Sequence, residues 1–419
     1  MKKPSLKINF AWAFVGNAVN ALCNYLLLMI LTKTAPVETV GLWGVAQAVT
    51  LPIATFFSLK LGTVNITDIH ADYKPGHYVT ARLLASLASV LVAVGIGLIF
   101  YSLTVACLIS MMAMSYSIAE IRLYFISNIQ KQERFGLVTV SQITVGVLTL
   151  LLFGLLFLLT KNLILAIMGT IISRGLVLFC YDIPMSAKVI SNHDVSFPGY
   201  APVWERSAVW SLLRRAAPLA IVATVGNISQ NIPRLVMDKT LGRDAVGYFT
   251  ALSMLLVVYT MVNAALGNAV LPRLSKYFVE NTKAFIRLYI QLIILNLFLG
   301  LAFVAFIFLF GKPILSLLFT PEYARHKDVM VMLAFSSCIL SVFGVSNWAL
   351  NATRQFAIQV PIYIGTAMTS LIFSLLLIPK YGIMGGAYAF MASYLFGVSL
   401  SLLFIIKAIG RNRLNDRQT

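Results

Sequence analysis

Long apolar stretches separated by short polar segments dominate the sequence. About twelve of them reach the roughly 20 residues that a helix needs to cross the hydrocarbon core of a bilayer. They predict membrane-spanning helices at 10–31, 40–59, 81–102, 104–126, 137–159, 163–186, 214–237, 246–271, 286–310, 329–350, 356–378 and 383–406. The pattern therefore predicts an all-α integral membrane protein.

The second half of the chain repeats features of the first half. The tripeptide VGN at 15–17 recurs at 225–227, and VGLW at 40–43 matches VGYF at 246–249. Matches in corresponding spans predict two six-helix lobes related by a parallel repeat, because six crossings return the chain to its starting side. We expect an N-terminal lobe at 1–187, a cytoplasmic interfacial linker at 188–211 and a C-terminal lobe at 212–419.

Composition excludes the usual interpretation of a basic chain. The chain has 32 Lys and Arg against 14 acids, a net charge of +18, yet 59% of its residues are hydrophobic. A soluble protein with this charge would suggest a nucleic-acid partner, but so little polar surface predicts a membrane protein and no nucleic acid. Lys and Arg concentrate in the loops that are cytoplasmic if the N-terminus is inside, so we expect both termini to be cytoplasmic.

Cysteine and histidine give no sign of a metal or redox centre. The four cysteines fall inside predicted spans without CxxC spacing, and the four histidines are scattered in or near loops. Such cysteines are typical of small buried apolar residues. We expect no metal and no catalytic residue.

Amide side chains inside the spans form one set of candidate substrate-binding residues. In the first span they lie at i, i+3 and i+7 on a single helical stripe, and the seventh span carries a similar stripe. Amides facing lipid are costly, so these stripes either hold helices together or line a polar cavity; the duplication favours a cavity. The set comprises Asn17, Asn20, Asn24, Asn227, Gln230, Asn231, Asn263 and Asn351.

Basic side chains inside the spans are the second set, because a base at the bilayer centre costs at least ~2.5–3.5 kcal/mol on insertion scales. Lys60 and Arg122 lie toward span ends, where they either reach the interface or contact substrate. Arg234 either pairs with Asp238 one turn later or binds substrate. Arg174, near the middle of the sixth span, has no acid within four residues. It is the strongest candidate for contacting an anion.

Embedded acids are fewer than embedded bases. Glu120, Asp182 and Asp238 are the candidates for proton or sodium coupling, with the alternative that Glu120 and Asp182 neutralise Arg122 and Arg174. An exporter of organic cations needs acids along its cavity. The excess of bases therefore predicts an anionic cargo.

Several motifs, taken in order and spacing, resemble one transporter superfamily. These are VGLWG at 40–44, LGRDAVGY at 241–248, LPRLS at 271–275 and YGIMGGA at 381–387. In them the chain resembles the multidrug/oligosaccharidyl-lipid/polysaccharide (MOP) exporters along essentially its whole length. Within that superfamily it is most similar to Wzx-type flippases of O-antigen and other polysaccharide repeat units.

The resemblance implies a MATE-like, V-shaped pair of lobes that works by alternating access. It also implies a cargo, an undecaprenyl-diphosphate-linked oligosaccharide of lipopolysaccharide or related polysaccharide biosynthesis, moved across the bacterial inner membrane. The implied partners are that glycan, membrane lipids, a polysaccharide polymerase and a chain-length regulator. No bound cofactor is implied.

Three alternatives stay open at the level of the sequence. A multidrug antiporter of the same fold would need acid-lined lobes. A lipid II flippase usually has additional spans, which are absent here. A membrane-bound polymerase or ligase commonly has a large periplasmic loop, whereas the longest loop here is short and predicted to be cytoplasmic. We therefore expect a transporter and not an enzyme.

Overall fold

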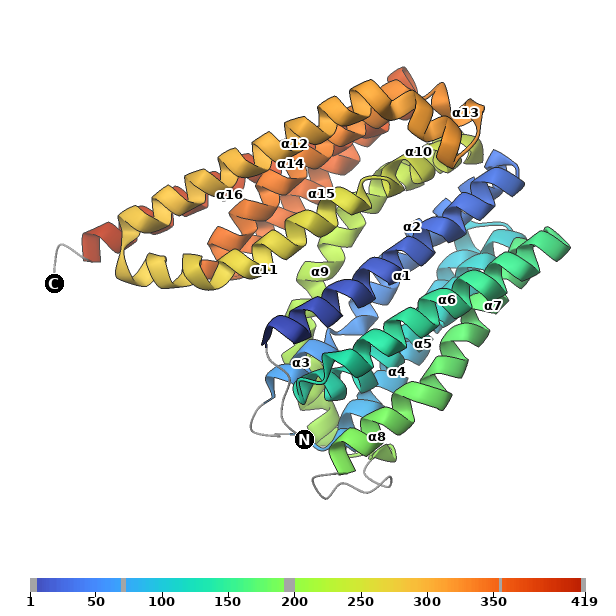
Figure 1. Ribbon diagram of the computed structural model, residues 1–419, viewed down its shortest axis with the longest axis horizontal. Coiled ribbons are helices and arrows are strands. Elements are labelled where there is room, and N and C mark those ends of the chain that lie inside the picture. Colours follow the sequence, from blue (N-terminus) through green and yellow to red (C-terminus); the bar gives the residue numbers. More distant parts are fainter. Residues whose placement is uncertain (1–5, 69–72, 192–199, 354–355, 416–419) are drawn as a thin grey trace. The chain divides into compact units, whose positions relative to one another are not determined.

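The computed structural model describes residues 6–68, 73–191, 200–353 and 356–415, so the predicted linker lies partly outside them, at 192–199. The described chain is helical and contains no strand, which confirms the all-α prediction. Its helices are α1 (Leu6–Thr34), α2 (Val37–Ser58), α3 (Leu61–Thr67), α4 (Pro75–Phe100), α5 (Leu103–Lys131), α6 (Phe135–Thr160), α7 (Leu163–Val177), the π-helical turn η1 (Leu178–Asp182), α8 (Ile183–Ser191), α9 (Arg206–Thr240), α10 (Arg243–Met254), α11 (Val257–Glu280), α12 (Thr282–Leu318), α13 (Pro321–Ala324), α14 (Lys327–Ala352), α15 (Phe356–Tyr381) and α16 (Ile383–Asn415) (Figure 1).

Ten helical segments of the described chain are long and apolar enough to cross a membrane. They correspond to ten of the predicted spans. The other two, at 214–237 and 246–271, lie in α9 and in the pair α10–α11, which a turn at Leu255 and Leu256 separates. The second predicted span, 40–59, corresponds to α2, which ends at Ser58; Leu59 and Lys60 then adopt left-handed φ angles of 48° and 46° before α3 begins.

The chain divides into two compact units. Unit 1 comprises Met1–Ala35 and Ala46–Thr224, and unit 2 comprises Pro36–Val45 and Val225–Thr419. Two helices, α2 and α9, therefore contribute residues to both units. The predicted repeat places α1, α5, α6 and α7 of unit 1 in the same order as α9, α14, α15 and α16 of unit 2.

The repeat segments at 40–43 and 246–249 contact one another within unit 2. A Cβ atom on Gly41 would collide with the carbonyl oxygen of Arg243, and a Cβ on Gly247 would lie 2.9 Å from the Val37 side chain. Val37 and Arg243 occupy matching positions of the repeat, so the contact is reciprocal. The start of α2 therefore packs on the start of α10 through two glycines, and an ion pair between Glu38 and Arg243 (3.3 Å) adds to it.

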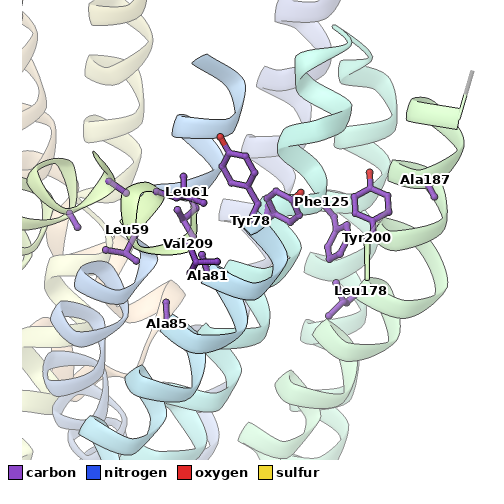
Figure 2. Close-up of a cluster of buried hydrophobic side chains, with 14 residues drawn as sticks. Leu59, Leu61, Tyr78, Ala81, Ala85, Phe125, Leu178, Ala187, Tyr200 and Val209 are labelled. Carbon is purple, nitrogen blue, oxygen red and sulfur yellow. The ribbon is translucent and has the colours of Figure 1, made fainter. Parts of the chain in front are cut away.

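A buried aromatic cluster in unit 1 holds the segment that leads into α9. The rings of Tyr78 and Tyr124 stack at 5.7 Å between centroids, and Phe125 lies 5.4 Å from Tyr200. Figure 2 shows the rings of Tyr78, Phe125 and Tyr200 in one row. The Val203 amide donates to the Gly76 carbonyl, so this segment is joined to the start of α4.

Glycines set the spacing of the last helix pair in each unit. In unit 1 the Cβ position of Gly169 in α7 lies 2.9 Å from the backbone of Leu152 in α6. In unit 2 the Cβ position of Gly385 in α16 falls against the carbonyl of Leu377 in α15. Because neither glycine carries a side chain, the two backbones of each pair approach closely.

Candidate functional site

A polar cavity of about 200 Å³ lies inside unit 1. Its walls come from α1, α5, α6 and α7, so two of the three amides of the α1 stripe, Asn20 and Asn24, face helices that carry embedded bases. The polar side chains that line it are Asn20, Asn24, Arg122, Gln142, Thr149 and Arg174. Four of the residues singled out in the sequence therefore meet here, and Gln142 and Thr149 join them.

Arg174 is the distinctive side chain of this cavity. Its Nη1 donates to the Ser115 hydroxyl at 2.8 Å, and its guanidinium carbon lies 5.5 Å from the centre of the Tyr116 ring. Within the described residues no carboxylate pairs with Arg174. The cavity therefore contains one guanidinium whose charge is held by a hydroxyl and an aromatic face alone, which leaves it available to an anion.

Arg122 has a different environment. Its Nε lies 2.6 Å from Asp182 Oδ2, and its Nη2 donates to the Ser141 hydroxyl at 2.8 Å. Ser141 in turn donates to Asp182, whose side chain is fully buried at the π-helical turn of the sixth span. Arg122 is thus held in a closed ion pair rather than reaching toward an interface. One of the two alternatives for Asp182, neutralising Arg122, describes this geometry.

Glu120 neutralises a base that the sequence did not single out. Arg82, which is 3% exposed, lies 3.6 Å from Glu120 Oε2 and donates to the Ser58 carbonyl at 2.7 Å. That carbonyl is freed because α2 ends at Ser58. The position of Arg82 at the edge of a predicted span is typical of an orientation-setting base, and the sequence offered Arg122 and Arg174 as partners of Glu120, so nothing in it pointed to Arg82. Lys60 is exposed at the same break and does not line this cavity.

A second cavity, of about 170 Å³, lies inside unit 2. Its walls come from α9, α14, α15 and α16, and none of its lining residues is charged. The polar and aromatic ones are Ser229, Gln230, Phe343, Asn347, Tyr363, Thr366 and Tyr394. Of the predicted site residues, only Gln230 reaches this cavity.

The other predicted residues line neither cavity. Arg234 donates to Asn231 (3.1 Å) and to Ser253 (2.8 Å), so polar side chains of unit 2 hold it. Two of the amides are held by hydrogen bonds: Asn231 donates to the Asn227 carbonyl, and Asn351 accepts from Gln359. Asn263 lies in α11 beside Gly344, and Asn17 is exposed on α1. Asp238, half-buried in α9, is also apart from both cavities.

The comparisons with known proteins agree with this architecture. Capsular polysaccharide biosynthesis protein CapF of Staphylococcus aureus is 27% identical over 382 residues, which cover 90% of this chain and 94% of CapF. Among solved structures, an inward-facing multidrug-resistance MATE transporter of the MOP superfamily has a TM-score of 0.76 at 13% identity, over 96% of this chain and 99% of the transporter. The lipid II flippase MurJ in an inward closed conformation has a TM-score of 0.74 at 14% identity, over 96% and 90%.

These two structural similarities establish the fold, and both neighbours are transporters rather than enzymes. The family assignment comes from the sequence. The model of the family described as "Polysaccharide biosynthesis protein" matches residues 6–278, more than half of the chain. This chain is therefore a multi-pass membrane protein of the polysaccharide biosynthesis protein family, with the fold of MOP-superfamily transporters.

Proposed function

We propose that this protein is a flippase that turns an undecaprenyl-diphosphate-linked oligosaccharide from the inner to the outer leaflet by alternating access. The cargo would be a repeat unit of a capsular, O-antigen or related polysaccharide. We place the protein in the bacterial inner membrane with both termini in the cytoplasm. The membership of the family and the similarity to CapF support the pathway.

Arg174 is the observation on which the anionic cargo rests. Arg122 and Arg82 are neutralised by Asp182 and Glu120, whereas Arg174 lines a cavity without an acidic partner in the described chain. A guanidinium offers a planar fork of donors that matches phosphate and carboxylate oxygens. Neighbouring amides and hydroxyls offer the paired donors and acceptors that sugar hydroxyls need.

The membrane potential favours the proposed direction. An inside-negative potential assists the outward movement of negative charge by about 2.3 kcal/mol per charge per 100 mV. Proton or sodium coupling would have to use Glu120, Asp182 or Asp238, and the first two are engaged with Arg82 and Arg122. We therefore propose that the charge of the cargo contributes to the driving force.

A deletion strain tests the proposal. Without the protein, lipid-linked repeat units should accumulate on the cytoplasmic leaflet, where they are protected from glycan-modifying reagents added outside the inner membrane of spheroplasts. Re-expression should restore their access to the outer leaflet. If the deletion strain shows no such accumulation and still exports polymer, the protein is not the flippase.

A further inference from the structure

The cavity of unit 2 combines aromatic rings, amides and hydroxyls without a charge. Phe343 and Tyr363 meet edge to face, with 5.6 Å between ring centroids. Asn347 donates from Nδ2 to the Tyr363 hydroxyl at 3.2 Å, which fixes the amide and the ring relative to each other. The cavity therefore has a rigid aromatic wall beside oriented polar groups.

Two buried polar atoms of this wall have no hydrogen-bond partner within the described chain: the Ser229 hydroxyl oxygen and Asn347 Oδ1. Ser229 is only 4% exposed. A serine in a helix usually donates to a carbonyl one turn earlier, and a buried polar atom without a partner costs about 1–3 kcal/mol. Their place on a cavity wall indicates that something entering the cavity supplies the partner.

The shape and size of the cavity restrict what that ligand is. A volume of about 170 Å³ is below the roughly 300–1,000 Å³ of pockets for drug-sized ligands, so it suits one small ring rather than a chain of sugars. A pyranose has an apolar C–H face for an aromatic ring and hydroxyls that both donate and accept. An anion finds no cation among the residues that line this cavity.

We propose that the cavity of unit 2 is a binding subsite for one uncharged monosaccharide. The sugar would lie against Phe343 and Tyr363, with its hydroxyls bonded to Ser229, Asn347 and Gln230, which is an exposed residue of α9. Thr366, whose hydroxyl donates to the Tyr363 carbonyl at 2.7 Å, can accept a further hydrogen bond. The identification of this sugar as part of a lipid-linked glycan rests on the proposed function, whereas sugar binding itself does not.

Binding of free sugars to the full-length protein tests the subsite. The probes are methyl β-glucoside and methyl N-acetyl-β-glucosaminide, with glucuronic acid as the charged comparison. They are measured by saturation-transfer-difference NMR on protein in lipid nanodiscs free of sugar-headgroup detergent. We expect saturable binding of at least one neutral glycoside to the wild type. Ser229→Ala and Asn347→Ala should each weaken it about three- to tenfold, the effect of losing one hydrogen bond.

A matched pair of variants controls for indirect effects. Thr366 and Thr369 both donate to a carbonyl of α15, but only Thr366 lines the cavity. Thr366→Val should weaken neutral binding, and Thr369→Val should leave it within about twofold of the wild type. Because the hydroxyl-to-methyl changes preserve volume, they remain informative if Asn347→Ala does not fold.

Three results would overturn the subsite. They are the absence of saturable neutral binding in the wild type, neutral binding by Ser229→Ala and Thr366→Val that equals that of the wild type, and loss of neutral binding in Arg174→Ala, which would place the sugar in unit 1. Failure of the flippase proposal is a separate outcome: neutral sugars would still bind here while the deletion strain accumulated no lipid-linked units.

Discussion

The cavities of unit 1 and unit 2 are built by corresponding helices and differ in their chemistry. The first, fourth, fifth and sixth spans of each half of the predicted repeat supply the walls, and both cavities are of similar volume. Unit 1 places Arg122 and Arg174 on its wall, whereas unit 2 places Tyr363 and Tyr394. The arrangement of helices thus determines where a cavity forms, and the side chains on its wall determine which chemical group it can bind.

Charge is distributed differently even within unit 1. Arg122 and Arg174 line the same cavity, but Arg122 is tied to a fully buried carboxylate and Arg174 to a hydroxyl and a ring. A closed ion pair contributes little net field to its surroundings, while the single guanidinium carries its whole charge. The basic character of this cavity therefore belongs mainly to one residue, and replacing each charged residue separately distinguishes structural from ligand-binding charge.

The largest effect is expected for stability, when the buried pair of unit 1 is broken. Asp182→Asn leaves Arg122 buried without its counter-charge and should lower the free energy of unfolding by about 3–5 kcal/mol. Thermal unfolding in nanodiscs measures this as a lower midpoint. Glu38→Gln, which breaks the exposed pair with Arg243 in unit 2, should cost at most about 1 kcal/mol. Equal midpoints for the two variants would show that the Arg122–Asp182 pair does not stabilise unit 1.

The second prediction concerns transport and the unpaired base. Arg174→Ala removes a charged hydrogen-bond donor from the cavity, worth about 1.5–3 kcal/mol, so transport should fall roughly 10- to 100-fold. Arg174→Lys keeps the charge but loses the planar fork, and should retain part of the activity. Complementation of the deletion strain and outer-leaflet labelling of the lipid-linked glycan measure the effect. Wild-type transport by the alanine variant would make Arg174 a structural residue.

Much of the fold was predictable because it depends on local patterns. Ten predicted spans coincide with helices that can cross a membrane, since a long apolar stretch has few alternatives in lipid. Asn20 and Asn24 share a face because helix periodicity alone places them there. The left-handed turn at Leu59 and Lys60 and the short helix α3 after it were not predicted, because the predicted second span ends at residue 59 and a hydrophobic pattern does not give backbone angles.

The contacts of the charged residues could not be predicted, because they depend on which helices are neighbours. Periodicity gives the face of a helix but not its partner. The pairs Arg122–Asp182 and Arg82–Glu120 join residues far apart in the sequence. The same reason explains why Asn263 and Asn351 line neither cavity although, like Asn20, they are amides within or at the end of a predicted span.

The third prediction tests the architecture that both units share. Gly169→Ala and Gly385→Ala each introduce a Cβ against the backbone of the preceding helix, where no side chain can move aside. Overpacking of this kind costs about 1–3 kcal/mol, more than the gain of up to ~1 kcal/mol in helix propensity. Thermal unfolding should show a lower midpoint for both variants. Gly175→Ala, on the same helix as Gly169 but with open space around it, should not lower it. A decrease in one unit alone would mean that only that unit depends on the close crossing.

The smallest effects are expected for Asn20 and Gln230, which lie at matching positions of the repeat, one on each cavity wall. Replacing either amide by alanine removes one neutral hydrogen bond, worth about 0.5–1.5 kcal/mol, so binding should weaken roughly two- to tenfold. Asn20→Ala should weaken glucuronic acid and spare the neutral glycosides, because its cavity contains Arg174. Gln230→Ala should weaken the binding of the neutral glycosides and leave the binding of glucuronic acid unchanged. Titration of both probes against both variants measures this. If each variant weakened the binding of both probes equally, the two cavities would not differ in the ligands they select. An amide alone does not distinguish a carboxylate from a hydroxyl, so any selectivity has to come from the rest of the cavity wall.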